Sequence, residues 1–358
     1  MLHALNRRLL ACALSLTLAI VPALAVEASP QQAALGFAGM DAPAADAAHR
    51  AFQRRADAAW MKYDKQLGQP LAAWARREVA YPGGGTVFYP FSGPDFLTAA
   101  LVFPNAERYV LVAIQTARRP AQPENMGALQ RQAFEKKLGG AWEKFGRLGF
   151  FRTDDLDDDQ RDLAGGVGTS TILMAFAARL GYAVTAVAPL GFNADKGEWE
   201  TLAANDKWAS VRLSLEKEGR KVTLDYLRLD LSDRGLQAAE PQQAWIRRMA
   251  ARPTLLKAAS HLLQEPHFTL LRDALVTHAP QVVQDETGLD YRDLGKIGTV
   301  RLYGNFVQTH GLFKTTTQRA LATAYKTEKA TGELPFAFSY LKRADARSMQ
   351  IARRQART

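Results

Sequence analysis

The sequence predicts an α/β protein with a Rossmann-like mixed sheet, in which parallel strands come first and antiparallel hairpins later, preceded by a helical N-terminal segment. Three observations lead to this class. Between residues 86 and 190, apolar strand-like runs alternate with helical periodicity, as in βαβ units packed on both faces of a sheet. Apolar and polar residues then alternate on both sides of Glu218-Gly219, as in a β-hairpin. Before the first strand, residues 50–80 carry apolar side chains at helical spacing.

Residues 1–25 have the composition of a secretory signal peptide. A basic start is followed by an apolar run from Leu9 to Val21 and by an A-x-A cleavage site at 23–25. The run is shorter than the roughly 20 residues needed to cross a bilayer, and a retained anchor is the alternative. We therefore expect a periplasmic or secreted protein. The single cysteine, Cys12, lies in this segment, which excludes disulfides, thiol catalysis and cysteine-based zinc sites from the mature chain.

Composition divides the rest into an alanine-rich linker at 26–49, a helical segment at 50–80, an α/β domain at 81–341 and a basic tail at 342–358. The tail holds six basic residues and one acidic residue, a large part of the net charge of +10. We expect a solvated helical end there, with contact to an anionic surface as the alternative. No basic stretch is interleaved with aromatic residues, so we expect no nucleic-acid partner.

Within the α/β domain, the elements are expected in a definite order. The expected strands are 86–91, 108–115, 183–190, the two arms of 209–231, 281–285, 299–306 and 335–340. The expected helices are 94–103, 124–147, 169–180, three pieces within 242–278, and 316–325. Pro253 and Pro266 separate the three pieces, because proline interrupts a helix.

The turn between the first strand and the first helix of the domain carries the first candidate site. Ser92-Gly93-Pro94-Asp95 matches a capping box in which Ser92 caps the helix and Asp95 reaches back to it. The same turn lies at the carboxyl edge of a parallel sheet, where α/β proteins bind ligands. A carboxylate at a helix start disfavours phosphate. We therefore expect a small polar ligand, hydroxyl-rich, amine-bearing or cationic, at Ser92, Gly93 and Asp95, with Gln115 at the end of the next strand.

The stretch 282–295 carries the second candidate site. Asp285 and Glu286 precede Tyr291 and Arg292, and paired carboxylates near such residues can hold a polar ligand or exchange protons. A hairpin turn with solvated charges is the alternative. The leading hypothesis is an exported ligand-binding protein. The rivals are a transferase- or hydrolase-type enzyme that uses Asp95 with Asp285 or Glu286, and an envelope-associated interaction protein that acts through 342–358.

Other patterns exclude common sites. The acidic run at 153–160 lacks the glycine and glutamate of an EF-hand, and 164–171 lacks the lysine of a phosphate loop. The histidines of the mature chain have no metal-binding spacing, so we expect neither a metal nor a cofactor. No G-x-S-x-G motif occurs, which leaves Ser92 a nucleophile only if a histidine meets it in space.

Two resemblances add to these expectations. The strand–turn–helix–strand unit at 86–115 resembles the opening of class I methyltransferase-like Rossmann folds. That family has a glycine-rich first turn and an acidic residue after the second strand, whereas this chain has Gly93 followed by Pro94, and Gln115. The resemblance therefore implies a degenerate form of the fold without its cofactor chemistry. The blocks YPFSGPDFL, YLRLDLSD, LLKAASHLL, QDETG and LYG are similar to those of an uncharacterised family of exported bacterial proteins, which implies export but no reaction.

Overall fold

The computed structural model describes residues 29–355 except 42–45, 150–166, 205–206, 314–315, 338–339, 342 and 344. The signal segment and the acidic run at 153–160 lie outside these residues, as do residues 26–28 at the start of the predicted linker. None of the helices in the described part is long and apolar enough to span a membrane.

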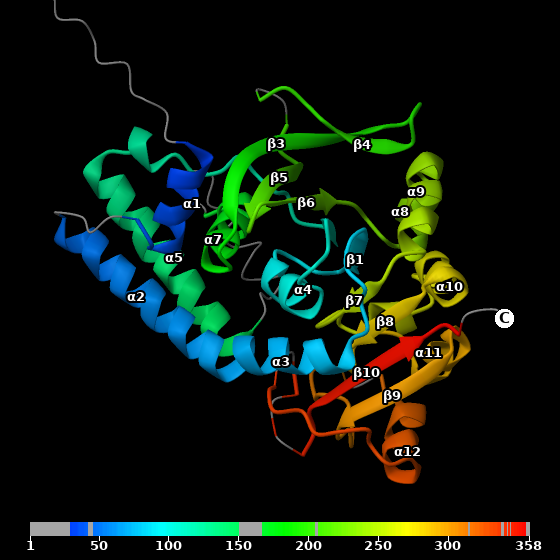
Figure 1. Ribbon diagram of the computed structural model, residues 1–358. Helices are drawn as coiled ribbons and strands as arrows, with labels where there is room; N and C mark the ends of the chain where they lie inside the picture. The colour runs from blue at the N-terminus through cyan, green and yellow to red at the C-terminus, as the bar shows by residue number, and fades with distance from the viewer. Residues whose placement is uncertain are drawn as a thin grey trace, which may run out of the picture.

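The described strands form one ten-stranded mixed sheet in the order β4-β3-β5-β6-β2-β1-β7-β8-β10-β9. It runs from β3 and β4 at the top of Figure 1 to β9 and β10 at the bottom. The strands are β1 (Thr86–Pro90), β2 (Arg108–Ala113), β3 (Ala183–Asn193), β4 (Glu198–Thr201), β5 (Ser210–Lys217), β6 (Arg220–Arg228), β7 (Thr254–Leu256), β8 (Gln281–Gln284), β9 (Thr299–Gly304) and β10 (Ser348–Arg353).

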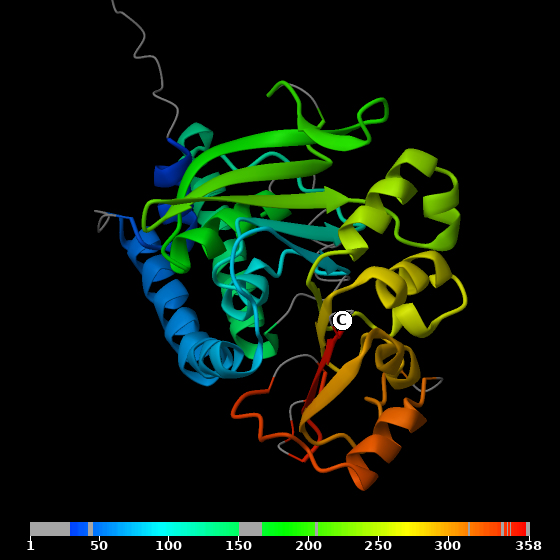
Figure 2. The same cartoon turned by 45° about the vertical axis from the view of Figure 1, so that its right-hand side comes forward.

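Helices cover both faces of the sheet, as the alternating pattern predicts (Figures 1 and 2). One apolar core joins one face to α1 (Pro30–Ala38), α2 (Ala47–Tyr63), α3 (Gln69–Glu78), α4 (Phe96–Val102), α5 (Ala128–Leu148) and α7 (Thr169–Arg179). A second core joins the other face to α8 (Asp233–Gln237), α9 (Glu240–Ala250), α10 (Thr269–His278) and α11 (Tyr291–Ile297). A smaller cluster packs α12 (Arg319–Thr327) against β9. The predicted α/β class with a helical N-terminal segment is confirmed.

The five central strands are parallel. β6, β2, β1, β7 and β8 pair in parallel, while β5, β3 and β4 extend the sheet on one side by antiparallel pairing. The predicted hairpin at Glu218-Gly219 joins β5 to β6. From β1 the parallel strands continue to β2 and β6 on one side, and the chain then crosses to β7 on the other side of β1. The carboxyl ends of β1 and β7 therefore flank a topological switch point, where doubly wound sheets bind ligands.

The predicted linker at 26–49 is wrong for its middle part, which forms α1. Ser29 caps this helix in a capping box with Gln32, and Pro30 stands in its first turn. Ala34, Phe37 and Ala38 are buried against the sheet side of the core. The alanines that suggested a linker are small apolar residues that let the helix pack closely.

The predicted tail at 342–358 is also wrong, because Ser348–Arg353 forms β10. This strand lies between β8 and β9 and is antiparallel to both. Its apolar residues are buried. Arg353 at its end donates to the carbonyl oxygen of Glu78, and Arg354, which follows the strand, donates to those of Val276 and Ala279. Because basic residues lie on either side of this six-residue strand, the composition of the segment did not indicate it.

Two further expectations differ from the structure within the α/β domain. The described part of 335–340 is not a strand, although Phe336 is buried in the core. The expected middle helix of 242–278 is replaced by the short strand β7 and a turn. β7 has three residues, too few for a periodic pattern to reveal. This change places the segment 257–261 at the switch point.

Candidate functional site

Three turns meet at the carboxyl edge of the parallel strands. They are 91–95 after β1, 257–261 after β7 and 285–289 after β8. Four of their residues are not glycine and yet have positive φ angles, namely Phe91 (60°), Ala258 (50°), Ser260 (53°) and His261 (61°). Such conformations cost of the order of 1–2 kcal/mol each and gather at functional sites. Backbone strain is thus concentrated where the fold class predicts a ligand.

Asp95 caps α4, and it does so in place of Ser92. The Oδ1 atom of Asp95 accepts hydrogen bonds from the backbone N–H of Thr98 (3.1 Å) and from its hydroxyl (2.9 Å). Its Oδ2 atom accepts from Nζ of Lys257 (2.7 Å) and from the hydroxyl of Tyr89 (3.1 Å). The predicted N-cap was therefore three residues early, because Ser92 and Asp95 close a turn before the helix begins at Phe96. Four donors occupy the carboxylate of Asp95, which is 2% exposed.

Lys257 is the buried partner of Asp95, and the sequence-based prediction did not assign it a role. Its ammonium group donates to Oδ2 of Asp95, to the hydroxyl of Thr98 (2.9 Å) and to the carbonyl oxygen of Gly149 (2.6 Å). These bonds use the three hydrogens of the group. A buried ion pair with its hydrogen bonds satisfied is a structural clamp. It ties the turn after β1 to the turn after β7 and to the end of α5.

Asp285 joins the turn after β8 to the turn after β7. Its Oδ1 atom accepts from the backbone N–H (2.9 Å) and the hydroxyl (2.5 Å) of Thr287, and its Oδ2 atom accepts from the backbone N–H of Ala258 (2.8 Å). This is the self-bonding turn that aspartate favours. The structure therefore brings Asp95 and Asp285 to neighbouring turns, linked through Lys257 and Ala258, with separate donors for each carboxylate.

Three buried polar atoms around the turn at 285–289 lack a hydrogen-bond partner in the described part of the chain. They are Nε2 of His261, Oε1 of Glu286 and Oε1 of Gln318. The backbone N–H of His261 donates to the carbonyl oxygen of Thr287 (3.0 Å), and Nε2 of Gln318 donates to that of Glu286 (2.8 Å). All three side chains are at most 3% exposed. Because a buried unsatisfied polar group costs free energy, such a group commonly marks a place for a ligand or a water.

Burial changes the protonation of two of these side chains. Burial, and then the charge of Asp285, raises the pKa of Glu286 well above its ordinary value. Burial lowers the pKa of His261 below its ordinary value, against the opposing charge of Asp285. These shifts favour the protonated form of the Glu286 carboxyl group and the neutral form of the His261 imidazole.

Aromatic side chains cover this cluster. The ring of Phe313 packs edge-on against His261 with centroids 4.9 Å apart, and Tyr340 packs against Phe313 at the same distance. The hydroxyl of Tyr340 lies 3.2 Å from the hydroxyl of Ser260. The cover comes from the segments that flank α12, far along the chain from the turns.

The remaining predicted residues make other contacts. The carbonyl oxygen of Gln115 accepts from the hydroxyl of Tyr226 (3.1 Å). Tyr291 donates to Glu328 at the surface, and Arg292 is exposed on α11. Ser92 donates to the carbonyl oxygen of Gly93 (2.9 Å).

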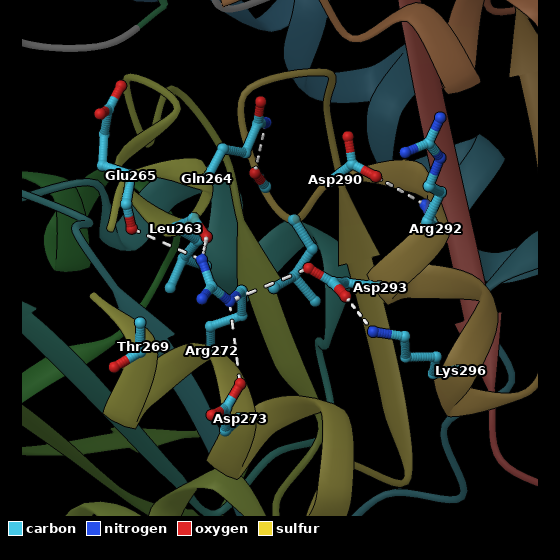
Figure 3. A network of polar contacts seen from close by, with 12 residues as sticks. Leu263, Gln264, Glu265, Thr269, Arg272, Asp273, Asp290, Arg292, Asp293 and Lys296 are labelled. Carbon is cyan, nitrogen blue, oxygen red and sulfur yellow. Dashed lines mark hydrogen bonds and ion pairs between the residues drawn. The ribbon is translucent and has the colours of Figure 1, made fainter. Parts of the chain in front are cut away.

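Figure 3 shows the surface of α10 and α11 on which Arg292 lies. Arg272 lies between Asp273 (3.8 Å) and Asp293 (3.9 Å), and Lys296 also binds Asp293 (2.7 Å). The contact drawn to Arg292 ends on its backbone nitrogen, which donates to Asp290. This network joins α10 to α11, and Arg272 also donates to the carbonyl oxygens of Leu263 (3.3 Å) and Glu265 (3.5 Å), in the segment that follows His261.

A cavity of about 300 Å³ lies elsewhere, among α1, α2 and α5. His49 belongs to its lining. Its Nε2 atom lies 2.9 Å from Oδ2 of Asp41, and its Nδ1 atom lies 2.8 Å from Oε1 of Glu135. Phe37 and Phe134 belong to its apolar lining. Within the described ranges, no group of three or more His, Cys, Asp or Glu side chains is arranged to hold a metal ion.

Searches of protein-family models, of curated proteins and of solved structures found no match to this chain. The chemistry of the site is therefore the basis for a functional proposal.

Proposed function

We propose that this protein binds a small polar ligand at the carboxyl edge of β1, β7 and β8, and that it acts after export. The observation that carries the proposal is the set of unpartnered buried atoms on His261, Glu286 and Gln318, at the switch point of a doubly wound sheet. The signal-like composition of residues 1–25 supports a place in the periplasm or outside the cell.

The Asp95–Lys257 pair has a supporting role in this proposal. Both charged groups have their hydrogen-bonding capacity filled by protein atoms, so a ligand would have to break a buried ion pair to reach them. The pair instead fixes the strained turn at 257–261 on which His261 stands. In this proposal Ser92, Gly93 and Asp95, where ligand contacts were expected, support the site instead.

The order of the strands supports the proposed relationship to methyltransferase-like folds. The parallel strands lie side by side in the order β6-β2-β1-β7-β8. When only these five are numbered along the chain, the order reads 3-2-1-4-5, which is the doubly wound arrangement. The departures at Gly93 and Gln115 remain, and the ligand we propose is not a nucleotide cofactor.

The aromatic cover determines how the ligand enters. Phe313 and Tyr340 lie on His261 and Ser260, so a ligand reaches the cluster when these two rings swing outward.

One observation favours an enzyme as the second candidate. Burial and the charge of Asp285 raise the pKa of Glu286, which favours its protonated form, and a carboxyl group with a raised pKa is suited to general acid catalysis. In that case Glu286, and not Asp95, would give its proton to the substrate of a hydrolase- or transferase-type reaction.

A thermal-shift screen of the purified protein tests the proposal. Sugars, polyols, amino acids, amides and nucleotides are added singly, because a ligand that binds the native state raises the melting temperature. We expect a compound that raises it in the wild type and has no effect on His261→Phe. The surface variant Arg292→Ala should respond as the wild type does. A compound that stabilises both variants equally binds elsewhere and contradicts the proposal. Turnover of the compound that is lost in Glu286→Gln while binding persists would identify the enzyme.

A further inference from the structure

We infer that the cavity among α1, α2 and α5 is a second binding site, which takes a small apolar amine. Glu135 holds the ammonium group of this ligand, and phenylalanine rings hold its hydrophobic body. The three helices cover the opposite face of the sheet from α10 and α11 (Figure 1). This site is therefore separate from the one at the carboxyl edge of the strands, and the inference does not depend on the proposed function.

The cavity is lined by apolar side chains and has the size of a small-molecule site. Its volume is about 300 Å³, and Phe37, Phe52, Phe134 and Leu138 belong to its lining. Each of these four is at most 4% exposed. The rings of Phe37 and Phe134 meet edge-on with centroids 6.0 Å apart. Because a cavity of about 150 Å³ holds benzene, this one has room for roughly an aromatic ring with a short chain.

Gly36 keeps this space open on the side of α1. It lines the cavity from the interior of the helix, and a Cβ atom at this position would meet open space, with no neighbouring atom within 4 Å. The backbone does not require glycine here, since the φ angle of Gly36 is not positive. Glycine weakens a helix relative to alanine. The chain thus carries an unfavourable helix residue where a larger side chain would take up part of the cavity.

Glu135 places a charged acceptor in the wall of the cavity. This residue is 7% exposed, and its Oε1 atom lies 2.8 Å from Nδ1 of His49. In the described part of the chain, its Oε2 atom has no hydrogen-bond partner. A buried carboxylate oxygen without a donor costs free energy, so it marks a place where a ligand can supply one. An ammonium group supplies such a donor together with the opposite charge.

The charges around the cavity also favour a cation. His49 lies between Glu135 and Asp41, and one imidazolium can balance only one of these two carboxylates. Three further charged residues line the exposed rim: Asp46, Glu124 and Arg131. Among the lining residues that the structure describes, four carboxylates therefore face at most two cationic groups. This excess attracts a cation and disfavours an anion, and the aromatic rings act in the same direction.

Isothermal titration calorimetry of the purified protein near neutral pH tests this inference with three probes of similar shape. They are 2-phenylethylamine, which is cationic, 2-phenylethanol, which is uncharged, and 3-phenylpropanoate, which is anionic. We expect the amine to bind and the alcohol to bind about tenfold more weakly or worse, because a hydrogen bond to a charged group is stronger than a neutral one. The carboxylate should not bind detectably.

Three variants locate the binding. Glu135→Gln keeps the size of the side chain and removes its charge, so the amine should bind about tenfold more weakly while the alcohol is unaffected. Glu143→Gln makes the same change at an exposed residue of α5 and should bind the amine as the wild type does. Gly36→Leu should fill the cavity and abolish binding of the amine, with a circular dichroism spectrum that shows an intact fold.

Nuclear magnetic resonance of the wild type provides a readout that does not depend on the folding of any variant. The ring protons of the bound amine should show nuclear Overhauser contacts to the ring of Phe134. Equal affinity for the amine and the alcohol would overturn the ligand class. Amine binding that is unchanged in both Glu135→Gln and Gly36→Leu would overturn the site, and so would the failure of all three probes to bind, since water alone would then occupy the cavity. His261→Phe should bind the amine normally, which keeps this test separate from that of the proposed function.

Discussion

The Nζ atom of Lys257 lies 2.7 Å from Oδ2 of Asp95, and both side chains are buried at the switch point between β1 and β7. The two residues are 162 positions apart in the chain, so this contact forms only when the two halves of the parallel sheet have come together. The pair therefore reports directly on the assembly of the site.

Replacing Lys257 with methionine leaves the carboxylate of Asp95 buried without its counter-charge. We expect the free energy of unfolding to fall by about 3–5 kcal/mol, the usual cost of breaking a buried pair from one side. Urea denaturation followed by circular dichroism measures this change. The matched control is Lys296→Met, which removes an exposed lysine from its pair with Asp293 and should leave stability unchanged. If the two variants are equally stable, Lys257 is not a clamp.

Ala258 is strained, and glycine at this position should relieve the strain. Its φ angle is 50°, a left-handed conformation that glycine adopts without a Cβ penalty. We expect Ala258→Gly to raise the free energy of unfolding by about 0.5–1 kcal/mol. The neighbouring Ala259→Gly is the control: Ala259 is buried without a positive φ, so this change should destabilise. A loss of stability in both variants would show that the turn holds no releasable strain.

The sequence predicts the sheet, its parallel first part and the carboxyl-edge turns, because alternating apolar runs and turn residues encode these features locally. It also leads to Asp95, Asp285 and Glu286, which the structure places on neighbouring turns. It does not lead to His261 as a turn residue, since three residues of β7 are too few to produce a periodic pattern. The partner of Asp95 was likewise hidden, because a pair across 162 residues leaves no local signal.

The apparent tail shows the same limit at the other end of the chain. Charge dominates the composition of 342–358, yet the decisive feature is a six-residue apolar strand inside it. A strand inserted between β8 and β9 takes its stability from neighbours that are distant in sequence, and composition cannot reveal such neighbours.

A core role for β10 predicts a large effect from a small change in that segment. Ile351 is fully buried between β8 and β9, so Ile351→Ala should lower the free energy of unfolding by about 2–5 kcal/mol. Leu129→Ala, at a side chain that is 82% exposed, serves as the comparison and should have little effect. Chemical denaturation of the two variants gives the answer. Equal stability would mean that the C-terminal segment is dispensable, as a solvated tail would be.

His49 makes the stability of the N-terminal helices depend on pH. Burial lowers the pKa of His49, but its bonds to Glu135 and Asp41 and their charges raise it above its ordinary value of about 6.5 overall. A group whose pKa is raised on folding adds stability that is complete below its unfolded pKa and is lost as the pH rises through its folded pKa. The stability contributed by His49 should therefore decline as the pH rises above about 6.5.

The measurement is the difference in free energy of unfolding between the wild type and His49→Gln, from urea denaturation at pH 5.5 to 8.5. Taking this difference removes the opposite effect of His261, whose lowered pKa makes stability rise with pH below about 6.5. We expect the advantage of the wild type to be greatest at the acidic end and to shrink as the pH rises. His278→Gln changes an exposed histidine on α10 and should follow the wild-type curve throughout. An advantage that grows with pH would mean that His49 is held neutral, and that its contacts with Asp41 and Glu135 are ordinary hydrogen bonds and not ion pairs.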